Sequence, residues 1–107
     1  MTEYADARLL LHEKLESLSK NVYFIQGDGT TLQYPCFVYS YTRPDVKRAN
    51  SKVYDMSMGF NVTYMTKNHV TVIDKMLDLF DYCSVDTLFV SDGVRHENFT
   101  VYIRRTI

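Results

Sequence analysis

The 107-residue sequence has no tryptophan, only two cysteines and no long hydrophobic run. Without an apolar stretch of about 20 residues, we expect no membrane-spanning helix. Cys36 and Cys83 do not form a C-x-x-C motif, so we expect neither a zinc site nor a redox site from them. The first residues show no basic stretch followed by an apolar core, so we expect no signal peptide, a cytoplasmic location and reduced thiols.

The sequence also lacks an excess of either sign of charge: the formal net charge is only -1 at pH 7. A domain that binds nucleic acid over its whole surface is usually basic, so this balance argues against one. Weak repulsion between copies permits self-association. Tyrosine is abundant instead: nine Tyr and six Phe suit both a core and a contact surface, since Tyr fills apolar space and keeps a hydroxyl group.

The strongest pattern is the alternation of apolar and polar side chains over residues 54–65. One set points to one face of a strand and the other set to the opposite face. The apolar positions are Tyr54, Met56, Met58, Phe60, Val62 and Tyr64. At about 3.3 Å per residue the strand would span roughly 40 Å, about twice a typical strand. Gly59 is a candidate for a bend or a bulge within it.

Periodicity and turn residues predict the remaining elements. Leu11, Leu15 and Leu18 share one helical face, and a second apolar helical stripe comprises Val70, Ile73, Met76, Leu77 and Phe80. We predict helices at 3–20 and 69–83, strands at 22–25, 34–42, 85–90 and 98–104, and hairpins at 25–34, 42–54 and 91–98. This order predicts one α+β domain over residues 1–107. Its sheet is mostly antiparallel (mixed), with about four to five strands and two helices packed on it.

Residues 43–53, R-P-D-V-K-R-A-N-S-K-V, interrupt the strand pattern. They carry Arg43, Lys47, Arg48 and Lys52 against Asp45, a local charge of +3 (four minus one). We predict a long basic loop here, and long loops in small domains tend to be functional or disordered. Any one of these basic residues is more often simply solvated. The loop as a whole is our candidate partner-binding segment.

No pattern of catalytic or ligand-binding residues stands out, so we expect no catalytic, cofactor-binding or metal-binding site and no enzyme activity. His12, His69 and His96 are scattered, without the spacing of a metal site. We expect His96 and Glu97 to be solvent-exposed. The glycine-rich segment Q-G-D-G-T-T at 26–31 lacks the G-K-[ST] of a phosphate-binding loop, so a hairpin turn is the better interpretation.

Three stretches resemble a known family: Y-P-C-F-V-Y-S-Y at 34–41, F-N-V-T-Y-M-T-K-N at 60–68 and R-H-E-N-F-T-V-Y-I at 95–103. With the order of elements, over about residues 5–103, they resemble the small tail-completion or tail-terminator proteins of long-tailed bacteriophages. The resemblance implies an α+β fold and a structural role in the virion neck, after assembly in the host cytoplasm. It also implies a homo-oligomeric ring, commonly a hexamer, that ends tail growth, and the isolated chain can be monomeric before assembly. Its partners would be tail-tube and head-connector proteins, with DNA only passing through the channel.

Two other classes stay open. The basic segment 43–53 also suits a small nucleic-acid-binding or regulatory module, whose affinity would fall steeply with salt. A small enzyme whose site forms only between copies would instead need a polar pocket at a subunit interface.

Overall fold

The computed structural model describes residues 2–24, 31–50, 52–68 and 70–104. In these ranges the elements are α1 (Thr2–Glu16), β1 (Val22–Phe24), β2 (Cys36–Ala49), β3 (Lys52–Thr66), α2 (Ile73–Leu79), β4 (Cys83–Ser91) and β5 (Val94–Arg104). They form an α+β fold with a mostly antiparallel sheet and two helices, which confirms the predicted fold class.

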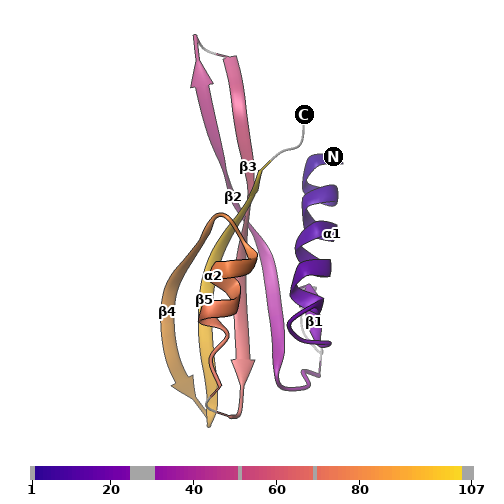
Figure 1. Ribbon diagram of the computed structural model, residues 1–107, viewed down its shortest axis with the longest axis vertical. Coiled ribbons are helices and arrows are strands. Elements are labelled where there is room, and N and C mark those ends of the chain that lie inside the picture. The colour runs from indigo at the N-terminus through magenta and orange to yellow at the C-terminus, as the bar shows by residue number, and fades with distance from the viewer. Residues whose placement is uncertain (1, 25–30, 51, 69, 105–107) are drawn as a thin grey trace.

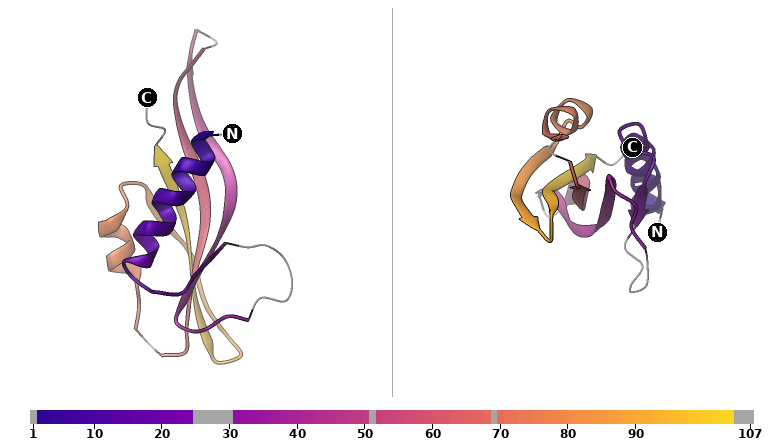
Figure 2. Two further views of the ribbon diagram at one scale, coloured as in Figure 1. Left: turned by 90° about the vertical axis from the view of Figure 1, so that its right-hand side faces the viewer. Right: turned by 90° about the horizontal axis from the view of Figure 1, so that it is seen from below.

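The strands lie side by side in the order β1-β2-β3-β5-β4. Only β1 and β2 are parallel, and the other neighbouring pairs are antiparallel. Figure 1 shows the two helices over the body of the sheet, α1 beside β1 and β2 and α2 near β4 and β5. Seen from below, the sheet curves around both helices, which therefore share one face (Figure 2).

The parallel pairing of β1 with β2 corrects the predicted hairpin at 25–34. Val22, Tyr23 and Phe24 align with Phe37, Val38 and Tyr39 in the same direction, and a hairpin joins antiparallel strands only. The predicted turn at 26–31 lies almost wholly outside the described residues.

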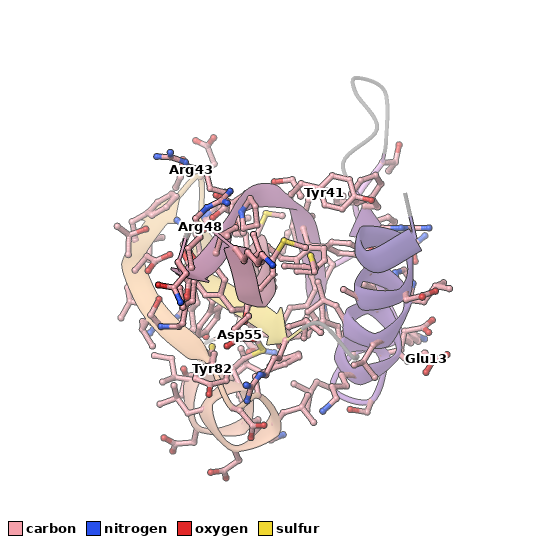
Figure 3. The ribbon with its side chains drawn as sticks, turned by 90° about the horizontal axis from the view of Figure 1, so that it is seen from above. Glu13, Tyr41, Arg43, Arg48, Asp55 and Tyr82 are labelled. Carbon is pink, nitrogen blue, oxygen red and sulfur yellow. The ribbon has the colours of Figure 1, made fainter. Side chains whose placement is uncertain are left out.

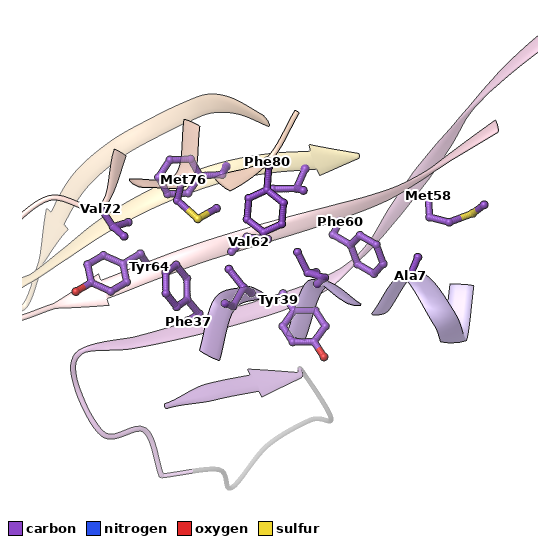
Figure 4. Packing of buried hydrophobic residues seen from close by; sticks show 14 residues of the cluster. Ala7, Phe37, Tyr39, Met58, Phe60, Val62, Tyr64, Val72, Met76 and Phe80 are labelled. Atoms are coloured by element: carbon purple, nitrogen blue, oxygen red, sulfur yellow. The ribbon is translucent and has the colours of Figure 1, made fainter. Parts of the chain in front are cut away.

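The core lies between the concave face of the sheet and the helices (Figure 4). Of the even-numbered residues of β3 that the alternation singled out as apolar, Met58, Phe60, Val62 and Tyr64 are buried in this core and Met56 packs against it, as one-faced burial of a strand requires. The fully or nearly buried members are Ala7, Leu11 and Leu15 of α1, Phe37 and Tyr39 of β2, Met58, Phe60, Val62 and Tyr64 of β3, Met76 of α2, Phe99 and Val101 of β5, and Val72 and Phe80 beside α2.

Both helices are shorter than predicted because polar side chains bind the backbone near their ends. Beyond Glu16 the hydroxyl of Ser19 donates to the Pro35 carbonyl at 3.1 Å, which draws the chain toward β2. Before α2, the Asn68 side chain accepts from the Val70 N–H at 3.0 Å, so the helix begins only at Ile73.

In α2 only part of the predicted apolar stripe is buried. Met76 and the following Phe80 are buried and Ile73 is half-buried, whereas Val70 and Leu77 are exposed. Cys83, predicted at the end of this helix, instead begins β4.

The predicted basic loop at 43–53 is wrong: these residues continue β2 and β3 as a projecting two-stranded hairpin. β5 pairs with β3 only up to Ser57, so the hairpin beyond it has two strands. We call residues 43–49 and 52–56 the arm. It gives the molecule its length, 50 Å against 27 and 22 Å across (Figure 1).

Where the arm leaves the body, a bulge and a glycine meet. Arg43 and Pro44 lie in a register shift of β2, between the pairs Thr42–Gly59 and Asp45–Ser57. A bulge is one of the few strand sites that accept a proline. A Cβ atom on Gly59 would lie 2.4 Å from the Arg43 carbonyl oxygen, so close backbone approach requires glycine here. The bulge predicted at Gly59 within β3 is instead in the opposite strand, β2, and Gly59 is the residue that it faces.

Candidate functional site

The arm holds all four basic residues of the predicted partner-binding segment. Arg43, Lys47, Arg48 and Lys52 are exposed, and none of the four forms an ion pair within the described ranges. Figure 3 looks down on the arm: Arg43 and Arg48 lie on one side of it, and Asp55 lies toward Tyr82. The structure therefore gathers these cations on one projecting ribbon and leaves them open to a partner.

The inner side of the arm is tied to the body at its base. The Arg104 Nε atom lies 3.2 Å from an oxygen of Asp55, at the end of β5. A shallow depression beside this pair is lined by Asp45, Lys47, Asp55, Ser57, Tyr82, Tyr102 and Arg104. The rest of the arm has no third strand beside it among the described residues, because β1 pairs with β2 only as far as Tyr39.

A second candidate surface is the edge strand β4. From Ser84 to Ser91 every residue is exposed, and Val85, Leu88, Phe89 and Val90 expose 38, 48, 46 and 65% of their surface. The strand C-S-V-D-T-L-F-V-S has no lysine, arginine or proline. Proteins usually protect an edge strand with such residues, with other charges or with a β-bulge, because its free N–H and C=O groups can pair with another strand. In β4 such protection is confined to Asp86 and the register shift between Val85 and Thr87, which leaves Leu88 to Ser91 as an uninterrupted edge.

The same side of the molecule is acidic. Residues 73–92, from α2 through the turn after β4, contain one lysine and five aspartates, a formal charge of -4; the aspartates are Asp74, Asp78, Asp81, Asp86 and Asp92. The arm segment 43–53 carries +3. Opposite charges are therefore concentrated in two parts of a chain whose net charge is only -1.

The helix-free face of the sheet is polar and bonded to itself. The Thr63 hydroxyl donates to the Asn98 side-chain oxygen at 2.7 Å, and the Asn98 amide donates to Thr87 at 2.6 Å. Asp86 accepts from the hydroxyls of Ser84 and Thr100. These side chains use one another as partners, which links β3, β5 and β4 across this face.

Glu97 is the polar residue that sequence reasoning misjudged. It was predicted to be exposed, yet it is fully buried. The Arg95 Nε and Nη2 atoms each lie 3.0 Å from its Oε2 atom. The Thr71 hydroxyl donates to Oε2 at 2.6 Å, and the Val72 N–H donates to Oε1 at 3.0 Å. Glu97 therefore fastens the segment before α2 to β5.

A signal for this burial was present in the sequence. Extending the alternation of β5 backwards from Phe99 and Val101 places Glu97 on the same buried face. The predicted strand began at residue 98, one residue too late to include it. A carboxylate at such a position must be paired, which Arg95 achieves from the same strand.

Among the described residues, the cysteines and histidines form no cluster. Burial raises the pKa of Cys36 to about 11, and burial with the nearby Asp86 charge does the same for Cys83. Both thiols lack the lowered pKa of a nucleophilic cysteine. The His12 Nδ1 atom lies 2.9 Å from the buried Tyr39 hydroxyl, whose pKa is raised chiefly by burial. The His96 ring stacks on Phe89 at 4.5 Å, and His69 lies outside the described residues.

The described part of the chain has neither a metal-binding cluster nor a membrane-spanning helix. No three His, Cys, Asp or Glu residues there are grouped so as to hold a metal ion. No helix there has the length and apolar character needed to cross a membrane.

Comparison with known proteins adds no relative: no protein-family model matches the chain, and no curated protein matches it significantly.

Proposed function

We propose that this chain is a structural protein of a bacteriophage virion, of the tail-completion or tail-terminator kind. Copies of it form a ring, a hexamer by the family resemblance, which caps the tail tube and joins the tail to the head. Its partners are tail-tube and head-connector proteins, and DNA passes through the channel. The proposal gives the chain no catalytic role and no cofactor.

The arm is the observation that carries this proposal. A two-stranded hairpin is at best marginally stable alone in water. Its residues from Pro44 to Ala49 are all exposed, so the arm adds little to the core. A small domain that maintains such a projection has a use for it, and contact with a neighbouring protein would cover its surface. The exposed edge of β4 adds a second surface suited to assembly.

The resemblance supports the phage assignment by the order of elements and by the three stretches quoted above. The observed α+β architecture is the one that the resemblance implies.

The first experiment is light scattering at rising protein concentration, alone and then with a tail-tube protein of the same phage. We expect a ring of defined mass in one of these conditions, as measured by light scattering and seen by negative-stain microscopy. A strict monomer that ignores both the tube protein and the connector protein would refute the proposal.

Nucleic-acid binding is the second candidate, because four cations on the arm have no acidic partner among the described residues. A titration with short duplex DNA at two salt concentrations tests it. Binding through phosphate contacts weakens steeply with added salt, by a slope close to the number of contacts made. Affinity that is absent at low salt would exclude this alternative.

A further inference from the structure

The arm and the edge strand β4 are complementary in backbone chemistry. In the described residues, no strand flanks the arm beyond its own two strands, and none flanks β4 on the side away from β5. Along an antiparallel strand, backbone groups point alternately toward and away from the neighbour. The Tyr102 N–H donates to the Tyr82 carbonyl at 2.9 Å, so the Val85 N–H, three residues on, points to the free edge.

The two surfaces are also complementary in charge and apolar content. Residues 43–53 carry +3, or +2 for the whole arm with Asp55, and residues 73–92 on the α2–β4 side carry -4. Val46 and Val53 of the arm are each more than one-third exposed, and β4 exposes Val85, Leu88 and Val90. Matched charge favours encounter and fixes register, and apolar side chains between added strands stabilise the contact.

Within one copy, the arm and β4 lie too far apart to pair with each other. The arm projects along the long axis beyond the body, and β4 lies at the far edge of the sheet in the body (Figure 1). A basic surface in one place and an acidic surface in another make a head-to-tail contact, which closes into a ring when the rotation between copies allows it.

We infer that the arm of one copy pairs with β4 of the next copy by strand addition, with the basic arm against the acidic α2–β4 side. The inference rests on the proposed function, because it names the joint between neighbouring copies of that ring. The occupant of the β4 edge is thus a second copy of this chain.

Charge exchange between the two surfaces tests the joint. Arg48 and Lys52 face Val53 and Ala49 across the arm, so Arg48→Glu/Lys52→Glu creates no like-charge pair within it. Asp78 and Asp81 are exposed, and Asp78 lies near the end of α2, where lysine is favourable, so Asp78→Lys/Asp81→Lys should fold normally. Urea denaturation and circular dichroism check that each variant is folded.

We expect each double variant alone to lose assembly, with an apparent dissociation constant raised by about 100-fold, because the charge of residues 43–53 falls from +3 to -1 in one variant and the charge of residues 73–92 rises from -4 to 0 in the other. An equimolar mixture should assemble better than either variant alone, because a native arm meets a native α2–β4 side at every second joint and the exchanged charges meet one another at the rest. A chain carrying all four changes should also assemble better than either double variant. Glu13→Lys, on the outer side of α1, is the control and should assemble as the native chain does (Figure 3).

A backbone variant separates strand addition from simple charge contact. Val85→Pro removes the N–H that faces the free edge, and Val85→Ala removes only the side chain beyond Cβ. We expect Val85→Pro to abolish assembly and Val85→Ala to retain it, with both variants folded. Equal assembly of the two would overturn strand addition at β4.

The outcomes separate this inference from the proposed function. If the native chain forms rings with tail-tube protein and charge reversal leaves them intact, the inference is wrong and the proposed function stands. If charge exchange works but no tail or connector protein binds, the joint is right and the phage role is wrong. A native chain that stays monomeric under every condition refutes both.

Discussion

The body and the arm are built from the same two strands, yet they are stabilised differently. In the body, Tyr39 and Phe60 are fully buried against the helices. In the arm, residues 43–49, 52 and 53 are all exposed. Burial of apolar surface contributes most of the stability of a fold. The body therefore folds on its own core, and the arm depends on cross-strand pairing and on whatever covers it.

This contrast shows that one alternating pattern can serve two purposes. At Met58, Phe60, Val62 and Tyr64 the alternation meets helices and neighbouring strands and forms a core. The boundary between body and arm lies at Ser57 of β3, which pairs with Arg104, the last residue of β5. Beyond this boundary, β2 and β3 continue as the mostly exposed arm. Such a surface suits contact with another molecule more than it stabilises the fold.

The largest loss of stability is expected for Phe60→Ala, in the core of the body. This ring is fully buried at the centre of β3, so its removal leaves a cavity and should cost about 3–5 kcal/mol of unfolding free energy. Urea denaturation followed by circular dichroism measures the loss. A cost below about 1 kcal/mol would mean that the body is far looser than its packing indicates.

Two ion pairs give the next test. Glu97→Gln removes the charge from a fully buried carboxylate bonded to Arg95, Thr71 and the Val72 N–H, and should cost about 2–3 kcal/mol. The matched change Asp55→Asn breaks the pair to the largely exposed Arg104 at the base of the arm, and should cost less than about 1 kcal/mol. Equal costs in urea denaturation would contradict the distinction between body and arm.

Gly59→Ala probes the boundary itself. The added Cβ would lie 2.4 Å from the Arg43 carbonyl oxygen and 2.8 Å from the Thr42 Cγ2 atom, so the bulge must shift. We expect a loss of about 1–3 kcal/mol, as for overpacking elsewhere. Thermal unfolding measures it, with Asn61→Ala, an exposed site two residues along β3, as the control. An unchanged melting temperature would show that the bulge adapts freely.

The smallest effect is expected in the arm. Val46→Ala alters a side chain that is 37% exposed, so unfolding free energy should change by less than about 0.5 kcal/mol. Val62→Ala, which removes the same atoms from a site that is 1% exposed, should cost several times more. A comparable cost at both sites in urea denaturation would show that the isolated arm is packed in solution.

Much of the fold could be predicted because its signals are local. The alternation over 54–65 predicted β3, although the strand extends to Lys52 and Thr66. Asp92 and Gly93 predicted the last turn, where both adopt positive φ angles of 52° and 77° as a tight hairpin requires. Such signals depend on which conformations a few neighbouring residues can adopt.

The candidate site was predicted only in part. Arg43, Lys47, Arg48 and Lys52 were identified as one basic group, but as a loop, because charged residues and a proline weaken a strand pattern. The bulge at Pro44 and pairing with β3 override that local preference. The exposed edge of β4 was not foreseen, because an apolar run looks the same in sequence whether or not another strand covers it.

The sequence by itself determined the class of fold, the face of β3 that is buried, the last hairpin and the separation of basic and acidic segments along the chain. Those features follow from side-chain period, turn chemistry and composition. Only the tertiary structure decided that β1 runs parallel to β2, that Glu97 is buried and that residues 43–53 form an arm. Each of these depends on a partner distant in the chain, whose contribution outweighs the local preference of the residues concerned.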